Sequence, residues 1–543
     1  MPEFKDRMRH RHAGAPWSMC DARTVTEFVH RHGSRLADKP LLIYEDGLQV
    51  TRGELLDHAE RFAGYLADRV GKGDRVAIMI GNRTVYFIAL FATIATRAVL
   101  VSFNPDAREH DAGYVLKDSR ATIVIVEARH RALIDGLRGE CPELREVIVV
   151  DENEPAGLAG CKGKRERLPF AESACEREDV TVVYYTSGTT GAPKGCMLHH
   201  GWWLRIVDID LRMNPEGRER GFCSVPFYYA DPAIYLMYAL QMGGSVVAMR
   251  KFSVSRYWDV VRANKVTKIH AIASIPVLLL KATPSAKERD HTVHHATCVA
   301  VPHNMHGQLV ERFGFPWLDN YGSTEAGQMC RVPLEYADQF IGSGSLGCPD
   351  PEVDLKIVDG DDREVPIGQP GQILVRGPEM FKGYLNKPEA TAEALKDGWY
   401  HTGDLGCFDQ RGCVYFLGRM KDIIRRSGEN LSAAEVEAVL RLHPKVLDAA
   451  VIPVPDEIRG EEVKAYVQLV AGATPDAVPP EEIVALCASK LAAFKVPRYV
   501  EYRLTDFPRT PSMRIQKEML KRERENLVAG VWDREQAMGP KLR

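Results

Sequence analysis

The chain has 543 residues, of which 45% are apolar and 27% charged, and its formal net charge is −3. These values are typical of a globular protein with more than one domain, and the small net charge argues against nucleic acid as a partner. The 12 cysteines include no Cys-x-x-Cys pair, so we expect reduced thiols and a cytoplasmic protein. Residues 1–12 lack an apolar core and no apolar run reaches about 18 residues, which predicts neither secretion nor a membrane span.

The first third of the chain alternates helical and strand patterns. Helices are predicted at 53–70, 85–96 and 132–138, and strands at 75–80, 121–127, 145–151 and 180–185. This repetition predicts an α/β sheet of parallel strands joined by crossovers.

A second wound sheet is predicted beyond residue 195. Its helices are expected at 202–211 and 257–264, and its strands at 245–249 and 269–273. After about Gly344, short strands at 353–358 and 372–376 are separated by Asp, Gly and Pro, which predicts a small β-barrel-like unit.

The C-terminal part is predicted to be a compact α+β domain of about a hundred residues. Its pattern is helix, strand, strand, helix, strand, at 433–442, 446–454, 462–470, 481–491 and 499–504. The segment 418–424 is the expected boundary. The fold class is therefore α/β and α+β, with a large domain of residues 1–420 and a small one of residues 421–543.

A loop rich in glycine and hydroxyl groups, Thr186 to Gly195, follows the strand predicted at 180–185. Its glycines allow consecutive backbone N–H groups to converge on an anion, its Ser and Thr add donors, and Lys194 adds a positive charge. The pattern predicts a phosphate site, with a surface turn as the alternative. It is not a Walker loop, because Lys194 lies between Pro193 and Gly195 rather than in a Gly-Lys-Ser/Thr triplet.

Three further motifs follow this loop, namely Tyr321-Gly322-Ser323-Thr324-Glu325, Tyr400-His401-Thr402-Gly403-Asp404 and Gly418-Arg419-Met420-Lys421-Asp422. With these four motifs in order, the chain resembles the adenylate-forming superfamily of acyl-CoA ligases, luciferases and peptide-synthetase adenylation domains. Within it, the chain is similar to carnitine-CoA-ligase-like enzymes and to fatty and aryl acid CoA ligases. This family forms an acyl-adenylate from ATP and a carboxylate, releasing pyrophosphate, and then passes the acyl group to a thiol such as that of CoA.

The resemblance implies roles for individual residues in holding the nucleotide, ATP or AMP. The residues that would bind the β- and γ-phosphates are Thr186, Ser187, Gly188, Thr189, Thr190, Gly191 and Lys194. The residues that would enclose adenine are Ala300, Val301, Pro302, Asn320 and Tyr321, with Gly322 and Ser323 beside them. Thr324 would bond the α-phosphate and Glu325 would bind Mg²⁺, a hard cation that prefers carboxylate oxygen. Asp404 would accept the ribose hydroxyls, with Arg419 nearby.

The resemblance also implies a mobile C-terminal domain that rotates about Lys421 between the two half-reactions. After this rotation, residues 425–430, which include Gly428, would line the tunnel for the pantetheine arm of CoA. Arg425 and Arg426 could instead be an exposed basic pair. The histidine pairs 199–200 and 294–295 are interpreted as structural, since their spacing is not that of a metal site.

The substrate is predicted to be an apolar carboxylic acid. Tyr228 stands where amino-acid-activating relatives carry an Asp that pairs with the substrate amine, and Asp231 is displaced from that position by three residues. Tyr228, Tyr229, Gly327 and Met329, with Trp202 and Trp203 near them, are the expected pocket residues. A role for these aromatic residues in the structural core is the alternative.

The last motif, residues 508–517, departs from the family pattern Pro-Arg-Thr-x-x-Gly-Lys-Ile, because Met513 replaces the Gly and Arg514 replaces the Lys. The family's Lys bridges the substrate carboxylate and ATP, and the larger planar guanidinium of Arg514 cannot simply occupy a site shaped for an ammonium group. We therefore predict weak or absent adenylation, with Arg514, Thr324, Glu325 and Lys421 as the catalytic candidates. Thioester formation would survive, and a separate enzyme would supply the acyl-adenylate.

Three alternatives remain. Lys517 could substitute for the missing Lys, which would give a complete ATP-dependent synthetase. A protein that binds a nucleotide or acyl-adenylate without catalysis is the second. A luciferase-like or peptide-synthetase-like enzyme is disfavoured, because the Asp for an amine is missing and no carrier domain follows Arg543.

Overall fold

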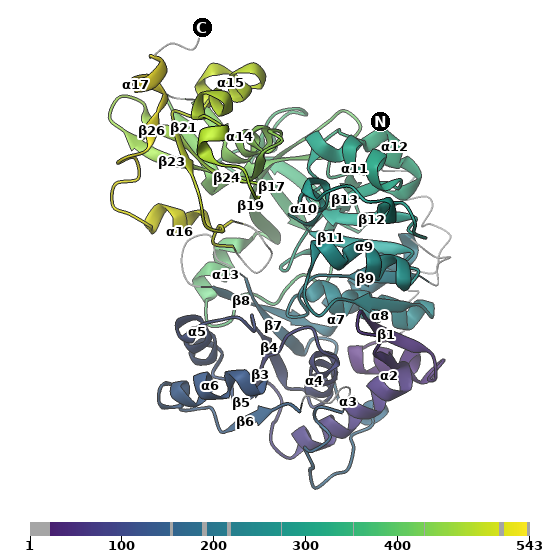
Figure 1. Ribbon diagram of the computed structural model, residues 1–543. Coiled ribbons are helices and arrows are strands. Elements are labelled where there is room, and N and C mark those ends of the chain that lie inside the picture. The colour runs from purple at the N-terminus through teal and green to yellow at the C-terminus, as the bar shows by residue number, and fades with distance from the viewer. Residues whose placement is uncertain are drawn as a thin grey trace.

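The computed structural model describes residues 22–151, 156–186, 193–213, 219–272, 274–350, 352–427, 429–509 and 515–539. Within them the strands form four sheets, two in the body, of six and nine strands, and two toward the C-terminus, of five and six strands. Figure 1 shows the body across the bottom and along the right, and the C-terminal unit, in yellow and light green, at the upper left.

The first sheet has the strand order β6-β5-β3-β4-β7-β8, and its strands are parallel except for β8, which runs antiparallel to β7. The strands are β3 Arg75–Met79, β4 Val99–Ser102, β5 Ile123–Val126, β6 Glu146–Val149, β7 Val180–Thr186 and β8 Lys194–His199. Val76 and Ile78 face a core shared with α4, while Ala77 and Met79 face one shared with α5 and α6, as the period of two in a strand requires. Helices therefore cover both faces.

The helices of this half are α2 Val25–Ser34, α3 Arg52–Ala67, α4 Thr84–Ala95, α5 Glu109–Ser119 and α6 Arg131–Leu137. Helix α3 begins at a capping box, in which Thr51 Oγ1 accepts from the Glu54 backbone and Glu54 accepts from the Thr51 backbone. Every residue of α4 is buried, because this helix lies in the core between the two sheets of the body.

The second sheet has nine strands in the order β15-β14-β13-β12-β11-β9-β10-β1-β2. They are β1 Pro40–Tyr44, β2 Gln49–Thr51, β9 Arg220–Cys223, β10 Ser245–Ala248, β11 Lys268–Ile272, β12 His295–Val299, β13 Trp317–Ser323, β14 Gly327–Arg331 and β15 Cys348–Pro349. Its helices are α7 His200–Met213, α8 Ala230–Met242, α9 Val254–Ala263, α10 Ser274–Lys281, α11 His306–Phe313 and α12 Ala337–Phe340. The run from β13 to β1 is parallel, which confirms the predicted second wound sheet.

The third sheet is antiparallel and five-stranded, where a small β-barrel-like unit is predicted. Its strands are β16 Asp354–Val358, β17 Gly371–Arg376, β18 Leu395–Lys396, β19 Trp399–Phe408 and β20 Val414–Arg419, with α13 Pro388–Ala394 beside them.

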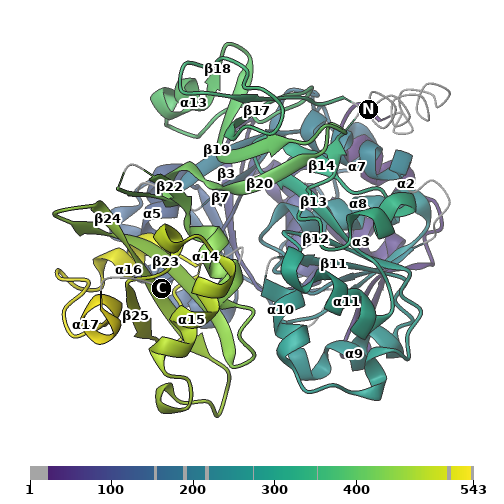
Figure 2. The same ribbon diagram turned by 90° about the horizontal axis from the view of Figure 1, so that it is seen from above.

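The C-terminal unit has a mixed sheet of six strands with helices around it. The strands are β21 Ile423–Arg426, β22 Glu429–Ser432, β23 Val446–Asp456, β24 Gly460–Leu469, β25 Tyr499–Tyr502 and β26 Trp532–Asp533. The helices are α14 Ala433–Leu440, α15 Pro480–Lys490, α16 Lys517–Arg522 and α17 Arg534–Met538. Figure 2 shows this unit beside the body rather than within it, and its apolar residues form clusters of their own.

The predicted helices and strands are confirmed to within a few residues, and the mixed α/β and α+β fold class is confirmed with them. Among the described helices, none combines the length and apolar character needed to cross a membrane.

Candidate functional site

Tyr321, Asp404 and Arg419 meet at a buried carboxylate. Asp404 lies directly opposite Arg419 in the antiparallel pair of β19 and β20, and the Arg419 Nε lies 2.7 Å from the Asp404 Oδ1. The hydroxyl of Tyr321, at the end of β13, donates to the Asp404 Oδ2 over 2.6 Å. Asp404 is 3% exposed. Burial raises the pKa of Tyr321 well above its usual value, and the Asp404 charge adds to this effect, so the phenol keeps its proton.

Thr324 and Glu325 lie in the short turn that joins β13 to β14, where Ser323 pairs with Gly327. Glu325 is buried, its carbonyl accepts from the Phe381 backbone, and its Oε1 accepts from the Tyr384 hydroxyl over 2.8 Å. The Lys194 Nζ lies 4.9 Å from the centre of the Tyr384 ring. Tyr384 therefore links the predicted metal residue to the Lys of the glycine-rich loop.

Tyr384 was missed by sequence reasoning. It belongs to a segment, 381–385, that contains no motif, and a single Tyr carries no signal of its own. The structure places it by pairing this segment with β8: Met197 N donates to Gly383 O over 3.0 Å, and Leu385 N to Gly195 O over 2.8 Å.

The glycine-rich loop joins β7 to β8 as an antiparallel hairpin, with Thr186 opposite Lys194. Gly195 is required at its position, because a Cβ there would lie 2.7 Å from the Val183 Cγ1. Ser187, Gly188, Thr189, Thr190 and Gly191 lie outside the described residues, so their part in a phosphate site stays a prediction.

The segment Ala300-Val301-Pro302 is held beside Asn320 by Asp319. One Asp319 oxygen accepts from the Ala300 N–H over 3.1 Å and the other from the Val301 N–H over 3.2 Å. Ala300 has a φ of +66°, in the left-handed region that costs a non-glycine residue about 1–2 kcal/mol. Burial raises the pKa of Asp319 to about 8, against the opposing effect of the backbone hydrogen bonds. Like Tyr384, Asp319 could not be recognised from the sequence, because it precedes the motif that begins at Tyr321.

Lys421 lies in the 3₁₀ turn Met420–Asp422 between β20 and β21. Its pKa is lowered by burial and then by the charge of Lys194, which places the predicted hinge close to the glycine-rich loop. Arg425 is exposed, whereas Arg426 is buried and its Nε lies 2.8 Å from the Glu462 Oε2. These two residues are therefore not an exposed basic pair. Gly428, Met513 and Arg514 lie outside the described residues.

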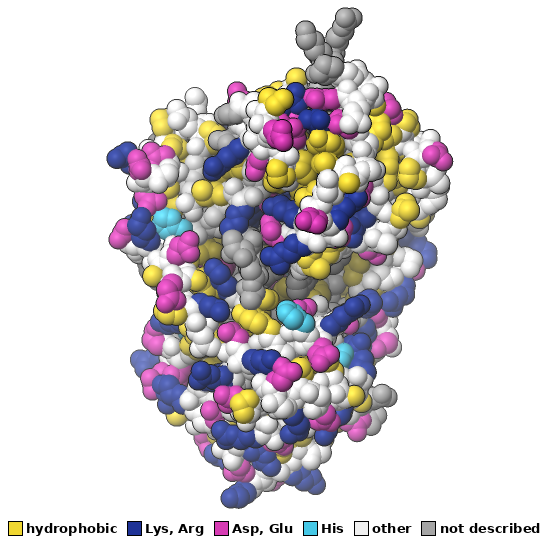
Figure 3. Space-filling model, turned by 90° about the vertical axis from the view of Figure 1, so that its left-hand side faces the viewer, with side chains coloured by type: hydrophobic (Ala, Val, Ile, Leu, Met, Phe, Trp, Pro, Cys, Tyr) yellow, Lys and Arg dark blue, Asp and Glu magenta, His cyan; other side chains and the backbone are white. Residues whose placement is uncertain are grey.

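Lys and Arg side chains gather around the hollow where the C-terminal unit meets the body (Figure 3). Among the described residues, Lys281 Nζ donates to the His443 carbonyl over 3.1 Å, and Asn304 Nδ2 to the Ala438 carbonyl over 2.6 Å, and these bonds join the two parts. A basic hollow fits anionic ligands.

The predicted substrate residues lie in different places. Tyr228 and Tyr229 pack against each other with ring centres 4.7 Å apart. Gly327 has a φ of +68°, and a Cβ there would meet Ile206 at 2.9 Å. Met329 is fully buried in the apolar core, as are Trp202 and Trp203. A cavity lies nearby, but its lining contains Asn320, Gln328 and residues of α8, β11 and β12 instead.

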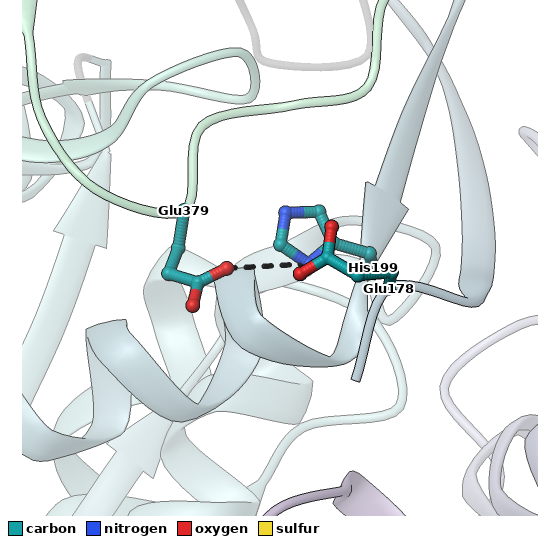
Figure 4. Close-up of side chains that lie close together, drawn as sticks. All are labelled: Glu178, His199 and Glu379. Atoms are coloured by element: carbon teal, nitrogen blue, oxygen red, sulfur yellow. Dashed lines mark ion pairs between the residues drawn. The ribbon is translucent and has the colours of Figure 1, made fainter. Parts of the chain in front are cut away.

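Glu178, His199 and Glu379 converge near β8, as Figure 4 shows. His199 Nε2 lies 3.1 Å from the Met380 carbonyl, and its Nδ1 accepts from the Gly201 N–H over 3.1 Å. The carboxylates of Glu178 and Glu379 pair with Lys382 and Arg177. Because the His199 ring bonds to the Met380 carbonyl and Glu379 lies beside it, this cluster joins the segment around 379 to β8.

Comparison with known proteins agrees with this architecture. The family model "AMP-binding enzyme" matches residues 29–385, and "AMP-binding enzyme C-terminal domain" matches residues 435–514. The chain is 30% identical to the long-chain-fatty-acid–CoA ligase of Bacillus subtilis (strain 168), over 93% of this chain and 95% of that protein. It is also 30% identical to the crotonobetaine/carnitine–CoA ligase of Citrobacter koseri, over 89% and 96% of the two chains.

Two solved structures are similar as well. The o-succinylbenzoate CoA synthetase (MenE) of Bacillus subtilis, in complex with its acyl-adenylate intermediate, has a TM-score of 0.80 and 27% identity, over 92% of this chain and 98% of that chain. The anthranilate CoA ligase AuaEII in complex with anthranoyl-AMP has a TM-score of 0.83 at 24% identity, over 92% and 96%, and shows the fold alone. With two family models and full-length relatives in agreement, the chain belongs to the family of AMP-binding, adenylate-forming enzymes that includes the acyl-CoA ligases.

Proposed function

We propose that this protein transfers the acyl group of an acyl-adenylate to the thiol of CoA, and that its own adenylation activity is weak. Its relatives are CoA ligases, and the buried Tyr321–Asp404–Arg419 cluster provides a fixed carboxylate of the kind that accepts ribose hydroxyls. The substitution of Arg514 for the family's Lys affects only the first half-reaction.

The two half-reactions place different demands on the site. In adenylation, a carboxylate oxygen of the acid attacks the α-phosphorus of ATP and pyrophosphate leaves. In thioester formation, the thiolate sulfur of CoA attacks the acyl carbonyl carbon, and AMP leaves with the electrons of the broken C–O bond. Asp404 would hold the AMP portion in both steps, whereas a positive charge that bridges carboxylate and ATP is needed only in the first.

The family implies Mg²⁺ for the step that uses ATP, and Glu325 is the residue that would hold it. The partner of its Oε1 is the neutral hydroxyl of Tyr384, whose proton is retained because burial and the Glu325 charge raise the pKa of the phenol. This contact of the carboxylate is thus with a neutral group, and a carboxylate oxygen suits a hard cation. The bound ion would neutralise phosphate charge.

The observation that carries the proposal is the position of Lys517, the residue that could replace the missing Lys. Its Nζ lies 2.8 Å from the Glu437 Oε1 and 3.4 Å from the Asp422 Oδ2, and its side chain is 13% exposed. Burial lowers its pKa, but the two carboxylates outweigh burial and the pKa is raised. Moving Lys517 to ATP would break a largely buried ion pair, which costs about 3–5 kcal/mol. Lys517 therefore supports the C-terminal unit rather than adenylation.

ATP–pyrophosphate exchange with Arg514→Lys and Lys517→Gln variants tests this assignment. Removing a well-placed transition-state donor costs roughly 10²- to 10³-fold, so Arg514→Lys should raise exchange by up to that factor. Lys517→Gln should leave the residual exchange of the unaltered protein unchanged. Exchange that is strong in the unaltered protein and lost in Lys517→Gln would show that Lys517 is the adenylating residue and would refute the proposal.

The acyl-adenylate would come from a separate adenylating enzyme. The prediction of an apolar acid rests on Tyr228, Tyr229, Gly327 and Met329, with Trp202 and Trp203 near them, and none of these residues lines the nearby cavity. The class of acid therefore stays a prediction.

A further inference from the structure

The cavity beside the nucleotide residues is small, with a volume of about 70 Å³. Asn320, which lines it, directly precedes Tyr321, and Gln328, which also lines it, directly follows Gly327. The cavity thus adjoins the two strands that carry the motif around Thr324. Its volume is far below the about 300–1,000 Å³ of sites for drug-sized ligands, so it suits a short group.

The strand register makes one wall of this cavity polar. Lys268 pairs with His295 and His270 pairs with Thr297 across β11 and β12. Residues two apart on a strand share a face, so all four side chains point to the same side of the sheet, and all four line the cavity. An apolar acyl chain would have little to pack against on this wall.

Helix α8 adds a carboxylate to the polar wall. The Tyr235 hydroxyl lies 2.8 Å from the His270 Nδ1 and 3.2 Å from the Thr297 Oγ1, and the His270 Nε2 lies 3.3 Å from the Asp231 Oδ1. The side chain of Asp231 is 40% exposed, whereas that of His270 is 2% exposed. Burial acts to raise the pKa of Asp231, but His270 outweighs it and the pKa is lowered, so Asp231 is a carboxylate.

Apart from the His270 Nε2, which faces Asp231, two buried polar atoms of the lining have no hydrogen-bond partner within the described part of the chain. They are the Nδ1 of His295, a residue that is 3% exposed, and the Oδ1 of Asn320. The pKa of His295 is lowered to about 3 by burial and by the neighbouring charges of Lys268 and His294, so the ring is neutral. Buried polar atoms in folded proteins are almost always satisfied, so these two indicate partners supplied by a ligand.

We infer that the acyl group taken by this protein is short and carries a hydrogen-bond donor, a hydroxyl or an ammonium group, that is bound by Asp231, His295 and Asn320. The unmet Oδ1 of Asn320 and the carboxylate of Asp231 are acceptors, and a neutral imidazole nitrogen can also accept. A site built to bond a donor discriminates strongly against an analogue that lacks it, because its own polar groups are then left unpaired. The inference rests on the proposed thioester-forming activity, whose substrate it specifies.

The test compares four synthetic acyl-adenylates as substrates for CoA thioester formation: butanoyl, 4-hydroxybutanoyl, 4-aminobutanoyl and dodecanoyl. We expect kcat/KM for the hydroxy or the amino substrate to exceed that for butanoyl by at least about 10-fold, with dodecanoyl the poorest. The better of the first two identifies hydroxyl or ammonium as the donor. The inference would be overturned if kcat/KM for butanoyl or dodecanoyl equalled or exceeded the values for both 4-hydroxybutanoyl and 4-aminobutanoyl. Thioester formation itself would still stand in that case.

A second readout separates the inference from the proposed function. Non-hydrolysable acyl-sulfamoyl adenosines with the same four acyl groups raise the melting temperature according to affinity, without any turnover. If no adenylate gives a thioester, the proposed function fails, and the ranking of these shifts still decides the inference: the donor-bearing groups must give the largest shifts.

Substitutions locate the effect in the cavity. Asp231→Asn keeps the shape of the side chain and should lower kcat/KM for the donor-bearing substrate by about 10-fold or more, with butanoyl changed less than about twofold. Thr297→Val, which removes a hydroxyl at nearly constant volume, should also lower kcat/KM for the donor-bearing substrate. This variant replaces Asp231→Asn in the test if Asp231→Asn folds poorly. Asp259→Asn, on the exposed surface of α9, is the matched control and should change neither substrate. Equal losses for butanoyl and the donor-bearing substrate in both cavity variants would refute the assignment.

Discussion

At the scale of single residues, the nucleotide site is built from charges whose positions are set by backbone pairing. Asp404 and Arg419 face each other because β19 and β20 pair in that register, and Tyr321 reaches them from β13 of the nine-stranded sheet. A hydrogen bond to a charged group contributes about 1.5–3 kcal/mol, so each contact matters for affinity.

Replacing Tyr321 with Phe removes the hydroxyl that donates to Asp404 and retains the ring. We expect the affinity for AMP, measured by calorimetry, to fall by about 10- to 100-fold. Tyr415→Phe, which removes a longer bond to Asp409 in the turn between β19 and β20, is the matched control and should have little effect. An unchanged AMP affinity in Tyr321→Phe would remove Asp404 from the proposed nucleotide site.

Asp319 gives the molecule a defined pH dependence. Its folded-state pKa, about 8, lies above the roughly 3.9 of an unfolded Asp, so the folded protein binds more protons between these values. Its contribution to stability is complete below about pH 4 and is lost as the pH rises through about 8. Between pH 5 and pH 9, the melting temperature of the unaltered protein should therefore fall more steeply with rising pH than that of Asp319→Asn. Parallel slopes would show that Asp319 does not titrate in this range.

At the scale of elements, the sequence predicts what is periodic and misses what depends on distant partners. Strand β7 and helix α4 are recognisable from apolar runs. Strand β8 was not predicted, since it is defined by pairing with β7 and with the segment around Tyr384. Asp319 and Tyr384 escaped prediction for the same reason: each has its role through a contact with a residue far away or outside any motif.

The β7–β8 hairpin is sensitive to a single methyl group. In Gly195→Ala the new Cβ would lie 2.7 Å from the Val183 Cγ1, with the Leu385 Cβ at 3.3 Å, so the strand must shift and carry Lys194 with it. We expect thermal unfolding to occur several degrees lower, corresponding to about 1–3 kcal/mol, together with weaker ATP binding. Gly136→Ala, in helix α6 with no atom within 4 Å of the new Cβ, is the control and should be neutral or stabilising. Equal behaviour of the two variants would show that the hairpin tolerates displacement.

At the scale of the whole molecule, the motifs predicted the family, and the structure shows how far apart in the chain the cooperating residues lie. A 3₁₀ turn, Met420–Asp422, joins β20 to β21. The domain boundary near residue 420 and rotation about Lys421 stay predictions. The class of acid stays a prediction, and the sequence alone does not reveal the cavity, because its lining side chains come from α7, α8 and four strands that only the sheet register brings together.

The central claim is that the protein retains the second half-reaction and has largely lost the first. The most direct measurement gives the unaltered enzyme, in parallel, ATP with a free acid and the matching preformed acyl-adenylate, each with CoA, and compares the two rates of thioester formation. We predict a rate from the acyl-adenylate that is at least about 10²-fold higher than that from ATP and acid. Equal rates from both starting points would contradict the account, since they would show that Arg514 supports adenylation as well as the family's Lys does.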